Sequence, residues 1–212
     1  VVAHTKLLFP CSPNNPSGNS RSDGKIEQRR QRYPGLVVVD EAYIDFASRP
    51  GFLPRLSQYD NLVVLHTFSK AWGAAAVRLG MAFAHPSIIA VFNKIKYPYN
   101  INLLTQRYAA EMLDRYPQVE AWVDELVASR ELLRRQLATL PVVRRIYPSD
   151  ANFLLVRVDD AQRVYDFLVG RGIIVRNRNK ITLCDNCLRI TVGTGEEDSL
   201  LIDASQSYSA SI

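Results

Sequence analysis

The chain has 212 residues, of which 47% are hydrophobic and 22% are charged, and this balance predicts a folded protein with a real core. No apolar run reaches the roughly 18 residues that span a bilayer, and the first residues lack a signal-peptide pattern, so we expect a soluble, cytoplasmic protein with no membrane partner. The net charge is +5, but the arginine clusters lack the aromatic interleaving of nucleic-acid modules, which argues against a nucleic-acid partner.

The first half of the chain alternates short apolar runs with turns and one helix. A short strand is expected over residues 6–9, followed by a loop and then a weakly amphipathic helix over 22–32. The continuous apolar runs 36–39 and 62–65 predict strands buried on both faces, as in a parallel sheet covered by helices. Polar residues follow both runs, at the edge where open α/β sheets bind ligands.

The second half of the chain predicts long helices and then a small α+β domain. Helices are expected over residues 102–116, 118–140 and 161–171 and again near the end of the chain. Strands are expected over residues 142–147, 152–158, 173–175 and 188–192. Pro117 is expected to end the first of these helices and Gly172 to cap the third.

The three cysteines, Cys11, Cys184 and Cys187, form neither a disulfide framework nor a metal site by number and spacing. A structural zinc ion normally takes four ligands, and no second cysteine pair accompanies Cys184 and Cys187. We therefore expect no metal, and we expect these two side chains to pack in a hairpin as small apolar groups.

Three polar segments carry the candidate chemistry. Asp40 ends the first buried run, where a carboxylate is costly unless a cation pairs with it. Lys70 lies just beyond the second run, flanked by the hydroxyls of Thr67 and Ser69. Asn15, beside a proline, is a rigid amide donor as well as good turn chemistry. Taken singly, each segment is also compatible with an ordinary structural role as a cap, a solvated lysine or a turn.

Taken together, the segments resemble the pyridoxal-5′-phosphate (PLP) aminotransferases of fold type I. The resemblance rests on Asn15-Pro16-Ser17-Gly18, Asp40-Glu41-Ala42-Tyr43 and Ser69-Lys70 followed by Arg78, in this order. Longer stretches resemble the histidinol-phosphate aminotransferases in particular: residues 11–16, 38–43, 67–71, 97–102, 149–156 and 188–194. The resemblance extends from the first residues to Asp198.

The resemblance implies a role for each matching residue. Lys70 is expected to hold PLP as a Schiff base and to act as general base, with Asp40 paired to the pyridine nitrogen. Asn15 and Tyr43 are expected to donate to the cofactor's phenolic oxygen, which makes Lys70, Asp40 and Tyr43 the catalytic set. The implied phosphate ligands are Thr67, Ser69 and Arg78, and the implied substrate-anion ligands are Arg176, Arg189 and Asn15.

The implied fold is α/β, with part of a mainly parallel large-domain sheet flanked by helices over residues 1–117, and a linking helix with a small α+β domain over 118–212. The chain opens at what is a mid-domain strand of the family, so the family's N-terminal part is expected to be absent from it. His66 stands where arginine is common, and the serine-rich stretch 203–212 does not match the family's final helix well.

The implied function is transfer of the amino group of L-histidinol phosphate to 2-oxoglutarate, giving imidazole-acetol phosphate and glutamate, in histidine biosynthesis. Two alternatives remain within the superfamily, namely an aminotransferase for aromatic amino acids and a threonine-phosphate decarboxylase. A third alternative, from another class, is a non-catalytic fragment that binds anions. The resemblance also implies a homodimer that acts on small-molecule substrates.

Overall fold

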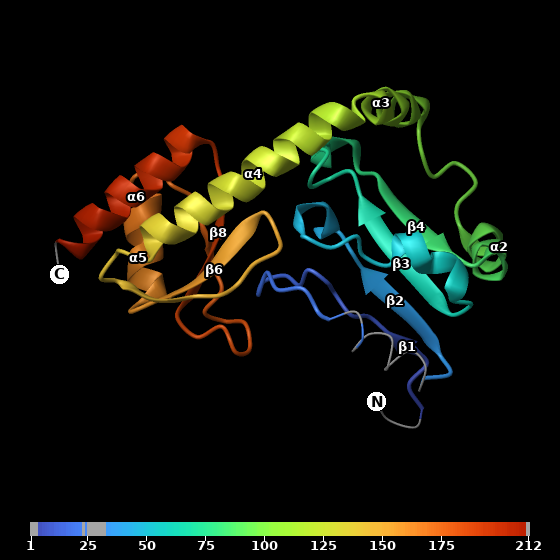
Figure 1. The fold of residues 1–212 in the computed structure, drawn as a ribbon, viewed down its shortest axis with the longest axis horizontal. Coiled ribbons are helices and arrows are strands. Elements are labelled where there is room, and N and C mark those ends of the chain that lie inside the picture. Colours follow the sequence, from blue (N-terminus) through green and yellow to red (C-terminus); the bar gives the residue numbers. More distant parts are fainter. Residues whose placement is uncertain (1–3, 23, 25–32, 211–212) are drawn as a thin grey trace. The chain divides into compact units, whose positions relative to one another are not determined.

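A computed structural model of the chain describes residues 4–22, 24 and 33–210 (Figure 1). The helix predicted over residues 22–32 therefore lies outside the described residues, apart from Ser22 and Gly24. None of the helices in the described ranges is both long enough and apolar enough to cross a membrane.

The chain divides into two compact units. The first comprises Val1–Asn14 and Ser20–Val123, and the second comprises Asn15–Asn19 and Asp124–Ile212. The break at residues 123/124 falls inside a long helix, beyond the domain boundary that the sequence predicts at 117/118. That domain boundary stays a prediction.

The first unit is built on a four-stranded sheet in the order β1-β2-β3-β4 (Figure 1). Its strands are β1 (Leu7–Leu8), β2 (Leu36–Asp40), β3 (Leu62–Thr67) and β4 (Gly80–Ala84). The first three strands run parallel and β4 runs antiparallel to β3, which confirms the mainly parallel sheet. β4 was not predicted, because its sequence contains no β-branched residue.

Successive side chains of β2 and β3 point to opposite faces of this sheet. One face carries a buried apolar cluster, and Asp40 emerges at the end of β2 on the other face. Val37, Val39, Leu62 and Val64 belong to one buried cluster, and none of them is more than 2% exposed. Because successive side chains of a strand point to opposite faces, Asp40 lies on the face opposite Val39. The apolar runs thus account both for the burial of the strands and for the face on which Asp40 emerges.

Helices of the first unit depart from the predicted ones at Pro117. The unit contains α2 (Pro86–Ile95), α3 (Leu103–Asp114), the start of α4 (Tyr116–Leu137) and the short 3-10 helices η1 (Ile44–Phe46), η2 (Leu53–Gln58) and η3 (Ala75–Val77). The prediction that Pro117 ends a helix is wrong. Pro117 lies in the first turn of α4, where the missing N–H has no helical partner to lose.

The second unit holds an antiparallel sheet in the order β5-β6-β8-β7. Its elements are β5 (Val143–Ile146), β6 (Phe153–Val158), α5 (Ala161–Val169), β7 (Arg176–Asn177), β8 (Cys187–Thr191) and α6 (Gly195–Ser209), with the larger part of α4. The strand predicted over residues 173–175 is wrong, since β7 begins at Arg176. Buried leucines of α4, β6 and α5, such as Leu133, Leu154 and Leu168, form the core with β8.

Local sequence accounts for the turn after α5 and for the continuation of α6 to its last residues. α5 ends at Val169 with Gly170 as its C-cap, two residues before the predicted cap. Gly172, with a φ of +77°, closes the turn that follows the helix: its N–H donates to the Val169 carbonyl, and the Ile173 N–H donates to the Leu168 carbonyl. α6 continues to Ser209 through the serine-rich stretch, although that stretch does not match the family's final helix well. Its serine hydroxyls donate to carbonyls four residues earlier, which keeps them compatible with a helix.

Cys184 and Cys187 are packing residues, as predicted. They form a small buried cluster with Leu155, and both are free thiols. Burial raises the pKa of each thiol, so the reactive thiolate is disfavoured. Among the residues that the structure describes, no group of three or more histidine, cysteine or acidic side chains is placed to hold a metal ion.

The start of α6 yields a stability prediction. The hydroxyl of Thr194 accepts from the Glu197 N–H and the Glu197 carboxylate accepts from the Thr194 N–H, a reciprocal capping box. Thr194→Ala is expected to lower the free energy of unfolding by about 1 kcal/mol, measured by urea denaturation with circular dichroism. Ser207→Ala, at an exposed site later in the helix, is the control and is expected to stay within ~0.5 kcal/mol. Equal losses in both variants would contradict the capping role.

Candidate active site

The carboxyl ends of β2 and β3 meet at one edge of the first unit's sheet. Asp40, the last residue of β2, lies in register with Leu65 of β3. Thr67, the last residue of β3, pairs with Gly80, the first residue of β4, so Arg78 approaches the sheet at the same edge. This edge gathers the following predicted residues: Asp40, Tyr43, Thr67, Ser69, Lys70 and Arg78.

Hydrogen bonds on both sides of the chain hold Asp40 in place. Its N–H donates to the Pro10 carbonyl at 3.0 Å, and its carbonyl accepts from the Ser12 N–H at 2.9 Å. Its Oδ1 accepts from the Ala42 N–H at 3.0 Å. The carboxylate is therefore oriented by one amide and keeps the capacity to accept from a cationic partner.

The side chains of Lys70 and Tyr43 lie together in the first unit. The Nζ of Lys70 is 5.2 Å from the centroid of the Tyr43 ring, a cation–π distance, and Tyr43 is buried. The turn around Lys70 is tight, because the Gly73 N–H donates to the Lys70 carbonyl and Gly73 adopts a φ of +63°. The contact with the Tyr43 ring and the tight turn together restrict the position of the Lys70 amine.

Thr67 and Arg78 contact the backbone around the Lys70 turn. The Thr67 hydroxyl donates to the Leu79 carbonyl at 3.3 Å and accepts from the Ser69 N–H at 3.0 Å. One guanidinium nitrogen of Arg78 donates to the Ala75 carbonyl at 3.0 Å. The Thr67 hydroxyl thus helps to shape the loop that carries the predicted phosphate ligands.

The second unit brings together all three predicted substrate-anion residues. Arg176 on β7 and Arg189 on β8 are direct cross-strand partners. The Nη1 of Arg189 donates to the Oδ1 of Asn15 at 3.1 Å, and its guanidinium lies 5.0 Å from the centroid of the Phe153 ring. Like charges directly opposite each other repel, and a bound anion offsets that repulsion through charge-assisted hydrogen bonds. The geometry therefore suits a carboxylate or a phosphate.

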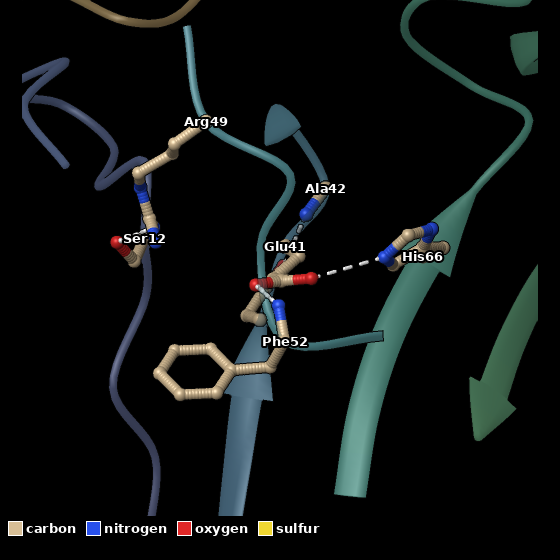
Figure 2. A network of polar contacts seen from close by, with 7 residues as sticks. Ser12, Glu41, Ala42, Arg49, Phe52 and His66 are labelled. Atoms are coloured by element: carbon tan, nitrogen blue, oxygen red, sulfur yellow. Dashed lines mark hydrogen bonds and ion pairs between the residues drawn. The ribbon is translucent and has the colours of Figure 1, made fainter. Parts of the chain in front are cut away.

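Sequence reasoning missed a buried acid beside Asp40. Glu41 is 1% exposed, its Oε1 accepts from the Phe52 N–H at 2.9 Å, and its Oε2 lies 3.1 Å from the Nε2 of His66 (Figure 2). The one available signal was a second carboxylate directly after an apolar run, where burial of a charge needs partners. His66 was noted only as a departure from the family.

Ser12 and Arg49 form a second contact that the sequence did not reveal. Ser12 is fully buried, and its hydroxyl oxygen accepts from the Arg49 guanidinium at 2.6 Å (Figure 2). The same oxygen also accepts from the Arg21 N–H at 2.8 Å. Because the Ser12 N–H also donates to the Asp40 carbonyl, this contact anchors the loop after β1 against the end of β2. Nothing in the local sequence marks Arg49 as a partner of a serine far back in the chain.

Similarity to known proteins extends over nearly the whole chain. The family model described as aminotransferase class I and II matches residues 2–204. The histidinol-phosphate aminotransferase of Bacteroides thetaiotaomicron is 53% identical to this chain over 204 residues, which are 96% of this chain and 59% of the relative. The chain thus spans about three fifths of the length of the curated relatives that it matches.

Solved structures of two kinds of enzyme share the fold. The histidinol-phosphate aminotransferase from Sinorhizobium meliloti, in complex with pyridoxal-5′-phosphate, matches with a TM-score of 0.87 at 26% identity, covering 97% of this chain and 57% of that one. The L-threonine-O-3-phosphate decarboxylase from Porphyromonas gingivalis matches with a TM-score of 0.86 over 97% of this chain and 65% of that one, but at 22% identity this likeness shows the fold alone.

These matches confirm the expected fold class, an α/β fold of which the chain covers a part. Because the family model extends over residues 2–204, the chain belongs to the class I and II aminotransferase family.

Proposed function

We propose that this chain carries the cofactor-binding and substrate-anion residues of an aminotransferase that converts L-histidinol phosphate and 2-oxoglutarate to imidazole-acetol phosphate and glutamate. The observation that carries the proposal is the meeting of Asp40 and the Lys70 turn at one edge of the first unit's sheet. The histidinol-phosphate aminotransferase of Bacteroides thetaiotaomicron, 53% identical to this chain, supports the choice of substrate.

The side chains at this edge fit the chemical groups of PLP. An amine suits its aldehyde, a carboxylate suits its protonated ring nitrogen, and a hydroxyl with a guanidinium suits its phosphate. Lys70, Asp40, Ser69 and Arg78 are residues of these types, and Tyr43 can donate to the phenolic oxygen. When bound, PLP supplies an electron sink that stabilises negative charge on the substrate's α-carbon.

Lys70 and Asp40 would divide the proton chemistry between them. The Nζ of Lys70 would first hold the cofactor covalently. Once the substrate amine has displaced it, the same nitrogen would take the proton from the α-carbon and deliver it to the cofactor carbon that carries the amino group. The contact with Tyr43 restricts where that nitrogen can lie. Asp40, oriented through Oδ1 by the Ala42 N–H, would keep a proton on the ring nitrogen.

Arg176 and Arg189 would bind the anionic groups of the two substrates in turn. A planar guanidinium offers two parallel donors that match a phosphate and a carboxylate equally well. Asn15 accepts from Arg189 through its oxygen, so its NH₂ group is the end that can donate to a bound ligand. The assignment of Arg176, Arg189 and Asn15 rests on contacts within the second unit.

Replacing Lys70 tests the cofactor assignment. Lys70→Ala is expected to abolish covalent attachment of PLP, because the variant lacks the amine that forms the link. The measurement is borohydride reduction after addition of PLP, followed by mass spectrometry of the peptide that contains residue 70. Lys94→Ala, near the end of α2, is the control and should keep the label on Lys70. Stoichiometric labelling of the Lys70→Ala protein at another residue would contradict the assignment.

Replacing Arg189 tests the substrate assignment. Arg189→Ala is expected to raise the KM for both L-histidinol phosphate and 2-oxoglutarate by about tenfold or more, because a charge-assisted bidentate contact is lost. Arg189→Lys should recover only part of the loss, since an ammonium group cannot reproduce the planar pair of donors. The readout is imidazole-acetol phosphate formation, with exposed Arg163→Ala as the control.

Unchanged KM values in Arg189→Ala would rule out this role. The same assay separates the alternatives when the amino donor is varied. Preferred turnover of phenylalanine or tyrosine would point to an aromatic aminotransferase, release of CO₂ from threonine phosphate would point to a decarboxylase, and absence of PLP binding would point to a non-catalytic fragment.

We further propose that the protein acts as a cytoplasmic homodimer. The support is a run of exposed large apolar side chains that extends from α2 through the following loop into the start of α3, of a kind that marks interaction surfaces. Their exposed fractions are 53% at Val91, 75% at Ile95, 84% at Tyr97, 96% at Tyr99, 59% at Leu103 and 78% at Leu104.

One charge within this run tests the dimer. Leu104→Asp is expected to shift the protein from dimer to monomer in sedimentation velocity, because a carboxylate would be buried without a partner at the interface. Leu132→Asp, at an exposed leucine of α4 in the second unit, is the matched control and should remain dimeric. A dimer that tolerates aspartate at residue 104 as well as at residue 132 would exclude this surface.

A further inference from the structure

Glu41 and His66 are each the chain neighbour of a residue at the candidate cofactor edge. Glu41 follows Asp40 at the end of β2, and His66 precedes Thr67 at the end of β3. The parallel register pairs Asp40 with Leu65, so one residue further on it brings Glu41 level with His66. The Glu41 N–H also donates to the Leu65 carbonyl at 2.9 Å, which fixes this level in the backbone.

The carboxylate of Glu41 is enclosed by groups of the first unit. Figure 2 shows Glu41 with the Phe52 amide on one side and the His66 ring on the other, at 2.9 Å and 3.1 Å from its two oxygens. Gly51 has a φ of +70°, and a β-carbon there would lie only 2.6 Å and 2.7 Å from the same oxygens. The loop that contains Gly51 and Phe52 is therefore wrapped closely around this one carboxylate.

His66 extends the contact to the next strand. Its ring meets the ring of Phe83 on β4 edge to face, with the centroids 5.6 Å apart. Its side chain is 18% exposed, whereas the side chain of Glu41 is fully buried. The pair thus joins the end of β2, the end of β3, the loop at Phe52 and, through Phe83, β4.

The pair lies on the face of the sheet opposite Asp40. Side chains alternate along a strand, so Glu41 shares the apolar face with Val37 and Val39, and His66 shares it with Val64. Asp40 and Thr67 emerge on the other face. A link on the apolar face can therefore hold the two strand ends without entering the candidate cofactor site.

We propose that Glu41 and His66 form a positioning pair that sets the placement of Asp40 relative to the Lys70 loop. This inference rests on the proposed function for its consequence, which is the correct seating of PLP. Thr67, the residue after His66, holds the Ser69 N–H with its hydroxyl, so displacement of His66 is passed directly to the loop that carries Lys70. Displacement of Glu41 is passed in the same way to Asp40.

The test compares variants of Glu41 and His66 with a variant of a core residue that is not part of the pair. Glu41→Ala removes both hydrogen bonds, and His66→Phe keeps an aromatic ring beside Phe83 but leaves the acid without its histidine. Glu41→Gln is the conservative variant, because its amide can still accept from Phe52 and donate to His66. Val64→Ala, at a fully buried position of β3, is the control for a general loss of stability in the same sheet.

The first readout is hydrogen exchange of the peptide spanning residues 66–74 in the protein without added PLP, followed by mass spectrometry. Exchange in Glu41→Ala and His66→Phe is expected to be about tenfold faster than in Val64→Ala, compared at conditions where thermal stability is equal. Glu41→Gln is expected to exchange like the unsubstituted protein.

The second readout is the dissociation constant of PLP. It should rise about tenfold more in Glu41→Ala and His66→Phe than in Val64→Ala, as expected for loss of a hydrogen bond to a charged group, and Glu41→Gln should restore it. Exchange in this peptide that equals that of Val64→Ala would overturn the positioning role. If the unsubstituted protein fails to bind PLP, the proposed function fails, and the exchange readout still decides the role of the pair in the loop.

Discussion

The arrangement of the first unit depends on the parallel register between β2 and β3. Backbone pairing sets Asp40 level with Leu65. This alignment determines which residues of the two strand ends lie next to one another. A shift of one residue would turn Asp40 into the apolar cluster and Glu41 onto the polar face. The apolar cluster that contains Leu62, Val64 and Phe52 opposes such a shift of β2, because the cluster would have to bury the carboxylate of Asp40.

The elements that the sequence predicted best are those with a local physical cause. The runs at β2 and β3 are apolar without interruption, and a polar residue ends each run, so the strands and the candidate edge were both predictable. The turn at Gly172 needs a positive φ that glycine adopts without strain. The candidate residues themselves were found by resemblance, since Asp40 or Lys70 alone is compatible with an ordinary structural role.

The features that the sequence did not predict depend on partners far away in the chain. β4 has a weak strand sequence and exists because β3 offers it an edge to pair with. A proline breaks a helix when it lies in the helix interior, whereas Pro117 lies in the first turn of α4. The contact between Glu41 and His66 and the contact between Ser12 and Arg49 join residues 25 and 37 positions apart, which no local pattern records.

The arginine pair of the second unit has a consequence for its hairpin. β7 is two residues long, and one of its two pairings sets Arg176 against Arg189. Dissolved salt screens repulsion between the two guanidinium groups, and an oxyanion bound to both would offset it more completely. Ionic strength and an anion bound to both arginines would therefore act on the same short strand, and either would favour the pairing of β7 with β8.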